Sequence, residues 1–189
     1  MTSAEVVRIA LTRLNTAGIP YMVVGSLASS FHGVPRTTQD ADVVIVPSSE
    51  ALTEFLQSME QDFYVPRGAA AVALQKRGMF NVVHLETGFK LDFIVRKSRP
   101  YSEEEFRRRQ EVLFGGGRCW FPSPEDALLA KLEWAKLTDS ERHVQDAAGI
   151  VQVQRDRLDW GYLRLWGREL GVLDLLWRVE GPGGAPVVE

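Results

Sequence analysis

The sequence predicts a mixed α/β (α+β) fold followed by a C-terminal helical bundle. Two observations carry this prediction. Short apolar runs bounded by glycine, proline or turn residues alternate with helical segments up to about residue 121, which is typical of strands interleaved with helices. After Ser123, the apolar residues recur at helical spacing only. We therefore expect an α/β core over residues 1–121, a helical subdomain over residues 122–180 and a flexible tail over residues 181–189.

The first half of the chain is expected to build a mixed sheet flanked by helices. The expected strands, each a short apolar run, cover residues 21–24, 41–46, 63–65, 80–85 and 89–95. The expected helices cover residues 3–17, 27–32, 48–60 and 103–109. Ser48 is the expected cap of the third of these helices. The alanine-rich segment 69–76 is expected to be a helical turn or loop.

The α/β half is expected to end with a hairpin, and the second half is expected to be entirely helical. Three successive glycines at 115–117 predict a tight turn between short strands at residues 112–114 and 119–121. Ser123 followed by Pro124 and two acids is a strong helix start, because serine caps the first turn and acids suit the positive end of the helix dipole. The further helices are expected over residues 140–153, 159–170 and 171–180.

The bulk composition describes an ordinary globular chain. Of its 189 residues, 45% are apolar and 25% are charged, so a core of this size needs no disulfide or structural zinc. Cys119 is the one cysteine, which fits a reducing cytoplasm. The net charge of -3 gives no overall signature of nucleic-acid binding. No apolar run is long enough to span a bilayer, and the N-terminus lacks a secretory pattern, so we expect a cytoplasmic protein without membrane association.

Asp40 and Asp42 stand at the start of an otherwise apolar strand. Side chains two residues apart in a strand point to the same face, so the two carboxylates are expected to lie together. At about 4 Å, two like charges repel by roughly 4 kcal/mol at an effective dielectric near 20. The fold tolerates this if the site is wet, if one acid is protonated, or if a cation such as Mg²⁺ lies between them. The alternative is that both aspartates are simply exposed to solvent at the start of the strand.

The Gly25-Ser26 pair follows the first strand. Glycine lets a backbone approach a ligand closely, and Ser26 is the expected N-cap of a helix that begins at Leu27. Free N–H groups and the dipole make a helix start a phosphate site. The alternative is an ordinary strand-to-helix turn.

A third acid, Asp92, lies inside a strand that otherwise reads as buried. An unpaired charge there is costly. Either Lys90 on the same face satisfies it, or it joins Asp40 and Asp42. Acids at three strand positions are what two-metal phosphoryl or nucleotidyl transfer requires, because two of them hold the metals and the third completes the site where the acceptor hydroxyl loses its proton.

These features together resemble a known signature. A strand, a Gly-Ser turn, a short helix, Asp-x-Asp on the next strand and a later strand aspartate are similar to the DNA polymerase β-like nucleotidyltransferase superfamily. The motif Arg-x-Thr-x-Asp-x-Asp, formed by Arg36, Thr38, Asp40 and Asp42, resembles the AbiEii/MenT-type nucleotidyltransferases of type IV toxin–antitoxin pairs.

The resemblance implies a nucleotidyltransferase fold and a set of site residues. It implies that the metal ligands and catalytic carboxylates are Asp40, Asp42 and Asp92. It implies that the nucleotide-binding residues include Gly25, Ser26, Arg36 and Thr38, with Arg36 near the nucleotide phosphates.

The family also has a lysine and an aspartate in its helical half, which match Lys131 and Asp146. Lys131 follows Leu128 and precedes Ala135 by about one turn each, so it borders an apolar stripe, from which a cation could reach the triphosphate. Asp146 stands four residues after Arg142. For Asp146, a surface ion pair with that arginine is the alternative to a catalytic role.

We therefore expect Mg²⁺-dependent or Mn²⁺-dependent transfer of a nucleotide monophosphate from an NTP to an acceptor hydroxyl. Arg36 and Lys131 would neutralise charge on the leaving pyrophosphate. By resemblance, the acceptor is the 3′ end of tRNA, and a cognate antitoxin is an expected partner. A protein hydroxyl (AMPylation) is the next option, and a catalytically silent module that binds a nucleotide or a partner is a rival of a different class. If the three aspartates were merely solvated, they would not converge.

Overall fold

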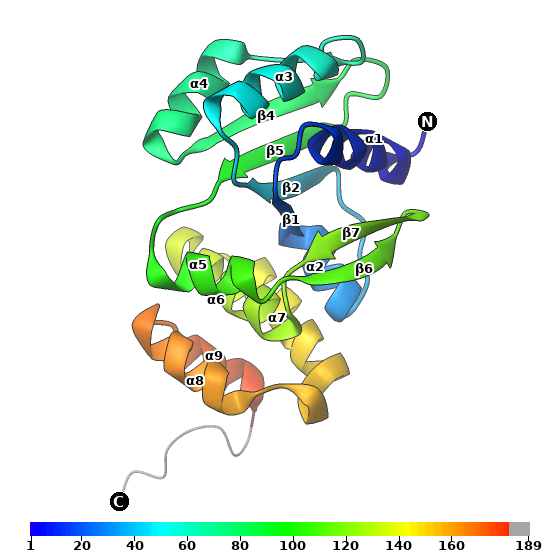
Figure 1. Ribbon diagram of the computed structural model, residues 1–189. Coiled ribbons are helices and arrows are strands. Elements are labelled where there is room, and N and C mark those ends of the chain that lie inside the picture. Colours follow the sequence, from blue (N-terminus) through cyan, green and yellow to red (C-terminus); the bar gives the residue numbers. More distant parts are fainter. Residues whose placement is uncertain (182–189) are drawn as a thin grey trace, which may run out of the picture. The chain divides into compact units, whose positions relative to one another are not determined.

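The computed structural model describes residues 1–181 and divides into two compact units (Figure 1). One unit comprises Met1–Val24 and Thr37–Phe121, and the other comprises Gly25–Arg36 and the chain from Pro122 onward. Residues 25–36 thus group with the C-terminal helices and not with the sheet on either side of them in the sequence. The remainder of the predicted domain division stays a prediction, and the predicted tail, apart from Gly181, lies outside the described residues.

The first unit is built on a five-stranded mixed sheet. Its strands, in order across the sheet, are β1 (Tyr21–Val24), β2 (Asp40–Ile45), β5 (Lys90–Val95), β4 (Met79–His84) and β3 (Phe63–Tyr64). The neighbours β2 and β5 run parallel, and every other pair is antiparallel. The predicted mixed sheet with flanking and C-terminal helices is confirmed.

One face of this sheet is a buried apolar core. Along the two central strands, alternate residues such as Val43 and Phe93 are fully buried, as the period of two requires. Phe93 meets Phe55 of helix α3 (Ser49–Met59) edge-on, with ring centroids 5.2 Å apart. The predicted cap of α3 is present, because the Ser48 side chain accepts from the N–H of Ala51. Helix α1 (Ser3–Thr16) and helix α4 (Arg67–Lys76) also belong to the first unit.

The opposite face of the sheet is apolar at one end only. There, Phe106 of helix α5 (Pro100–Arg107) packs with Met22, Val24 and the partly buried Val44. Because side chains alternate along each strand, the same face carries the aspartates of β2 and β5 further along. The sheet therefore presents a polar area beside an apolar one.

A two-stranded hairpin, β6 (Gln110–Phe114) and β7 (Gly117–Phe121), completes the first unit. Gly115 and Gly116 both have positive φ, 57° and 80°, which is the conformation that a two-residue hairpin turn favours and that glycine adopts at least cost. Cys119 lies buried in β7, and burial raises the pKa of its thiol to about 11.

The boundaries of several elements differ from the sequence prediction, and three differences concern helices of the first 107 residues. The alanine-rich segment forms a complete helix, α4, because alanine has the highest helix propensity. Helix α5 begins earlier than expected, since Pro100 fits its first turn. Helix α2 (Gly25–His32) begins at Gly25 and not at Leu27.

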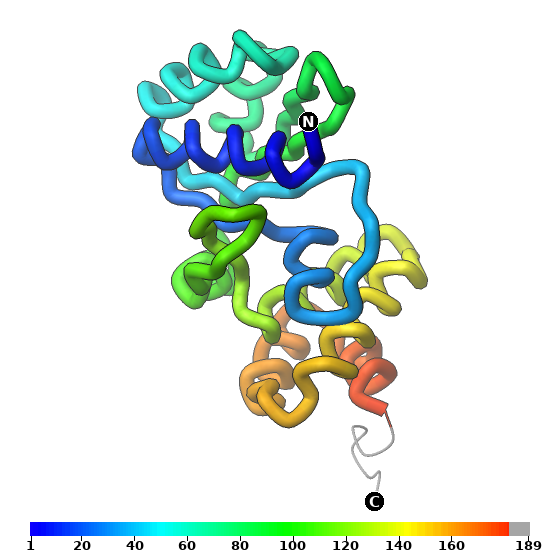
Figure 2. The backbone as a smooth tube through the Cα atoms, turned by 90° about the vertical axis from the view of Figure 1, so that its right-hand side faces the viewer, coloured from blue at the N-terminus to red at the C-terminus, as the bar shows by residue number. Residues whose placement is uncertain are grey.

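The second unit is entirely helical. Besides α2 it contains α6 (Pro124–Thr138), α7 (Glu141–Gln154), the short 3-10 helix η1 (Arg155–Arg157), α8 (Trp160–Glu169) and α9 (Leu173–Glu180). The Ser123 cap of α6 is confirmed, since its hydroxyl accepts from the N–H of Asp126. Figure 2 shows residues 25–36 beside the C-terminal helices. Among residues 1–181, no helix is both long and apolar enough to cross a membrane.

A close backbone approach joins α2 to α7. A Cβ placed on Gly33 would lie 2.7 Å from the backbone nitrogen of Ile150 and 2.8 Å from the carbonyl carbon of Gly149. Only glycine therefore fits at this position without backbone movement. Nearby, Nε2 of His32 lies within hydrogen-bond distance of the Pro122 carbonyl, at 2.8 Å. These contacts hold the end of α2 in the helical unit.

Candidate active site

Two of the predicted aspartates are direct neighbours in the sheet. Asp42 of β2 is paired with Asp92 of β5, and Asp40 is paired with Lys90 in the same parallel register. Paired residues on adjacent strands share a face, and Asp40 and Asp42 share one by the period of two. The three aspartates and Lys90 therefore lie together on one face of the sheet, and we call these four residues the carboxylate face.

Asp92 is the most buried member of the carboxylate face, with 6% of its surface exposed. Its Oδ2 accepts from the Lys90 ammonium at 2.9 Å. Its Oδ1 is buried and has no hydrogen-bond partner among the described residues. Such an atom is costly unless a ligand satisfies it. Of the two outcomes that the sequence left open for Asp92, the pair with Lys90 is present. Asp92 also shares its face of the sheet with Asp40 and Asp42, and a joint metal site of the three aspartates stays a prediction.

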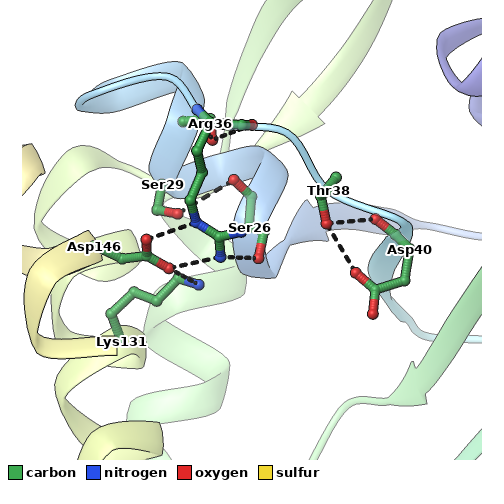
Figure 3. A network of polar contacts seen from close by, with 8 residues as sticks. Ser26, Ser29, Arg36, Thr38, Asp40, Lys131 and Asp146 are labelled. Atoms are coloured by element: carbon green, nitrogen blue, oxygen red, sulfur yellow. Dashed lines mark hydrogen bonds and ion pairs between the residues drawn. The ribbon is translucent and has the colours of Figure 1, made fainter. Parts of the chain in front are cut away.

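Thr38 orients the third carboxylate. Its hydroxyl lies 2.9 Å from Oδ1 of Asp40 and 3.2 Å from the Asp40 carbonyl (Figure 3). A hydroxyl that donates to a carboxylate limits its rotation. Thr38 therefore acts on the carboxylate face through Asp40.

The carboxylate face has the donors that a hard divalent cation prefers, but it is not a closed cage. In the part of the chain that the structure describes, no three histidine, cysteine, aspartate or glutamate side chains gather closely enough to hold a metal ion as they stand. Lys90 and Thr38 instead hold two of the carboxylates. Mg²⁺ binds through one or two carboxylates together with substrate phosphates, and the unpartnered Oδ1 of Asp92 is a suitable ligand atom. The residues present therefore fit such an ion.

Lys90 responds to all three carboxylates. The pKa of its ammonium is raised, first by the hydrogen bond to Asp92 and further by the charges of Asp92, Asp40 and Asp42. The Lys90 side chain is nevertheless 41% exposed. It is therefore a counter-ion at the edge of the carboxylate face and not a buried partner.

Asn81 was not singled out by the sequence, although it belongs beside this site. It is paired with Asp92 across β4 and β5, so its amide is on the same face. Asn81 is exposed, between the buried residues Phe80 and Val82. The sequence did show that Asn81 is a polar residue between two apolar residues of a strand. It did not show that this strand lies next to the strand of Asp92.

The helical unit contains a charged cluster of Arg36, Lys131 and Asp146 (Figure 3). Arg36 binds Asp146 through two atoms, with Nε to Oδ1 at 2.7 Å and Nη2 to Oδ2 at 2.9 Å. The Lys131 ammonium lies 2.7 Å from Oδ2 of the same carboxylate. The side chains of Lys131 and Asp146 are 5% and 8% exposed. Two cations thus converge on one anion.

This arrangement corrects the alternative interpretation of Asp146. A surface pair with Arg142 is wrong, because the Asp146 side chain is buried against Arg36 and Lys131. Burial alone would raise the pKa of Asp146, but the hydrogen bonds from Arg36 and Lys131 outweigh it and lower that pKa. Asp146 therefore stays ionised and holds both cations in place.

The Gly-Ser turn differs from the expected capping geometry. Gly25 has a φ of 64°, which lets the chain pass from β1 directly into α2. Ser26 therefore lies in the first turn of α2, and the expectation that it caps a helix beginning at Leu27 is wrong. Its hydroxyl accepts from Nη2 of Arg36 at 2.5 Å. Ser26 is thus joined to the cluster of Arg36, Lys131 and Asp146.

The fold and the carboxylate face together define a nucleotidyltransferase-like protein. The chain belongs to the family described as "Nucleotidyltransferase of unknown function (DUF6036)", whose model matches residues 4–165. No curated protein matches the chain. The predicted nucleotidyltransferase identity is confirmed at this level, and the finer resemblance to AbiEii/MenT-type enzymes stays a prediction.

Solved structures share the fold at low sequence identity. An antigenic nucleotidyltransferase-like protein from Paracoccidioides brasiliensis superposes with a TM-score of 0.58 at 17% identity, over 94% of this chain and 91% of that one. The antibiotic-resistance factor ANT(2'')-Ia superposes with a TM-score of 0.53 at 14% identity, over 88% of this chain and 91% of that one. The lincosamide antibiotic adenylyltransferase LnuA, bound to lincomycin, superposes with a TM-score of 0.52 at 14% identity, over 81% of this chain and 98% of that one. These likenesses concern the fold.

Proposed function

We propose that this chain is a metal-dependent nucleotidyltransferase that moves a nucleotide monophosphate from an NTP to an acceptor hydroxyl. The observation that carries the proposal is the pairing of Asp42 with Asp92 on parallel strands, with Asp40 on the same face. A fold has no structural need to gather three acids there, since like charges repel. Family membership supports the same reaction class.

The carboxylate face has the main catalytic role in this proposal. Asp40, Asp42 and Asp92 would hold Mg²⁺ or Mn²⁺, which supplies positive charge for the triphosphate when it is bound. The acceptor oxygen attacks the α-phosphorus, the bond to the bridging oxygen of pyrophosphate breaks, and the hydroxyl proton passes to a carboxylate. We assign that proton to the Asp92 carboxylate, which would also complete the metal site.

The nucleotide-binding roles fall to the other predicted residues. Gly25 and Ser26 would bind phosphate at the start of α2, and Thr38 would keep Asp40 in position. Arg36 and Lys131 would stabilise charge that develops on the leaving pyrophosphate. Asp146 binds both of these cations, so we assign it a positioning role.

The acceptor that we propose is the 3′ end of tRNA. The support is the motif formed by Arg36, Thr38, Asp40 and Asp42, which resembles the AbiEii/MenT-type toxins. A cognate antitoxin would then be the protein partner. Small-molecule hydroxyls are the second candidate, because ANT(2'')-Ia and LnuA, which share the fold, are an antibiotic-resistance factor and an antibiotic adenylyltransferase. A protein hydroxyl is the third.

The test presents all three kinds of hydroxyl to the full chain. The protein is incubated with each α-labelled NTP and Mg²⁺ or Mn²⁺, and with total tRNA, with tobramycin or lincomycin, or with cell lysate proteins. We expect label on tRNA that is lost when its 3′ hydroxyl is oxidised by periodate. Asp42→Asn should abolish labelling, whereas Asp174→Asn, an exposed residue of α9, should not. Label that persists in Asp42→Asn would show that the assigned site is wrong, and NTP binding without transfer would favour a silent module.

A further inference from the structure

Lys90 holds a place on the carboxylate face that the proposed chemistry does not use. It is paired with Asp40 across β2 and β5 and lies two residues before Asp92 on the same face. Its ammonium lies 2.9 Å from Oδ2 of Asp92. A positive charge thus already lies on one of the three carboxylates that would bind a metal.

The two partners of this ion pair are buried to very different degrees. The Asp92 side chain is 8% exposed, whereas that of Lys90 is 41% exposed. An ammonium at the surface on a flexible four-carbon stem can move away at low cost, while the buried carboxylate cannot. The pair is therefore able to open from the Lys90 side, and Asp92 then needs another cation.

We propose that Lys90 is a built-in counter-ion that occupies the carboxylate face in the nucleotide-free protein and yields it to the metal ion when the metal arrives with a nucleotide. This inference rests on the proposed function, because it concerns the same carboxylates. Its consequence is specific. Metal alone competes with a tethered cation and binds weakly, whereas a metal–triphosphate complex also provides phosphate oxygens for the displaced ammonium.

Charge balance supports this exchange. A divalent ion that joins Lys90 among the carboxylates adds like charge close to the ammonium, which is unfavourable. A triphosphate brings several negative charges, so Lys90 gains an anion when it loses Asp92. Each ligand would then relieve the unfavourable charge that the other leaves at the Lys90–Asp92 pair. The nucleotide and the metal would therefore bind with positive cooperativity.

The test measures Mn²⁺ binding to the full chain by electron paramagnetic resonance, without nucleotide. Lys90→Met should bind Mn²⁺ at least about tenfold more tightly than the wild type, or about 1.4 kcal/mol. Lys90→Arg, which keeps the cation, should bind as weakly as the wild type. Lys76→Met, an exposed lysine of α4, makes the same charge change away from the site and should have no effect. When a non-hydrolysable ATP analogue is also bound, the Mn²⁺ affinity of Lys90→Met should no longer exceed that of the wild type by as much, or should fall below it.

Two results separate failure of this inference from failure of the proposed function. If Asp42→Asn and Asp92→Asn remove Mn²⁺ binding while Lys90→Met leaves the dissociation constant unchanged, the counter-ion role is overturned and the metal site stands. If Asp92→Asn binds Mn²⁺ as the wild type does, the metal site itself is wrong. Thermal unfolding of each variant verifies that Lys90→Met is folded, and added Mn²⁺ should raise its unfolding temperature more than that of the wild type.

Discussion

Asp42 and Asp92 are paired residues on the two parallel strands β2 and β5, so their carboxylates share one face of the sheet. They come from positions far apart in the sequence, and the register of one strand pair brings them together. Lys90 and Thr38 then hold Asp92 and Asp40, respectively. This relationship organises the candidate active site.

Replacing Thr38 by valine should impair catalysis without unfolding the chain. Valine keeps the shape of threonine but removes the hydroxyl that lies 2.9 Å from Oδ1 of Asp40. A hydrogen bond to a charged group contributes about 1.5 kcal/mol or more, so kcat/KM for the NTP should fall at least about tenfold. Steady-state kinetics checks this, with Thr38→Ser as the control that keeps the hydroxyl. Equal activity in the valine variant would show that Thr38 does not orient Asp40.

Replacing Asp146 by asparagine should destabilise the helical unit. The substitution leaves Arg36 and Lys131 without the anion that both contact. Removing one partner of a buried ion pair typically costs 3–5 kcal/mol, and because Arg36 is partly exposed we expect a loss of about 3 kcal/mol in the free energy of unfolding. Urea denaturation measures this loss. Asp174→Asn should change the free energy by no more than about 0.5 kcal/mol.

The same carboxylate makes stability depend on acid pH. The pKa of Asp146 lies below its ordinary value of 3.8 in the folded chain, so its ionised form stabilises the fold at every pH above the unfolded-state value. That contribution is lost as the pH falls through the folded-state pKa. The free energy of unfolding of the wild type exceeds that of Asp146→Asn. This difference should shrink more between about pH 5 and pH 2 than between pH 8 and pH 5. A constant difference in urea midpoint across both ranges would contradict this account.

Gly33→Ala should be destabilising because the new methyl group would meet backbone atoms. The nearest are the Ile150 nitrogen at 2.7 Å and the Gly149 carbonyl carbon at 2.8 Å, followed by the Ser29 carbonyl oxygen at 2.9 Å. Forcing a methyl group into such a contact typically costs about 1–3 kcal/mol. Gly68→Ala on α4 is a matched control, since nothing lies within 4 Å of its added Cβ, and it should be neutral or stabilising. Thermal unfolding compares the two, and equal unfolding temperatures would exclude the close approach at Gly33.

The strands and the shared face of Asp40 and Asp42 could be predicted from the sequence because they depend on local alternation. The pairing of Asp42 with Asp92 could not, because apolar periodicity does not reveal which strands are neighbours or in which register. The partners of Asp146 could not be predicted for the same reason. Arg142 is its neighbour along the helix, but Arg36 binds it from 110 positions away. The family resemblance thus singled out the charged residues of this cluster, and tertiary packing decided their partners.

The position of a bound metal ion tests the central claim most directly. Crystals of the full chain would be grown with Mn²⁺ and a non-hydrolysable NTP analogue, and anomalous diffraction would locate the manganese. We expect a peak about 2.1 Å from carboxylate oxygens of Asp42 and Asp92, with the Lys90 ammonium no longer on Oδ2 of Asp92. Manganese bound elsewhere, with the Lys90–Asp92 pair intact beside the bound nucleotide, would contradict it.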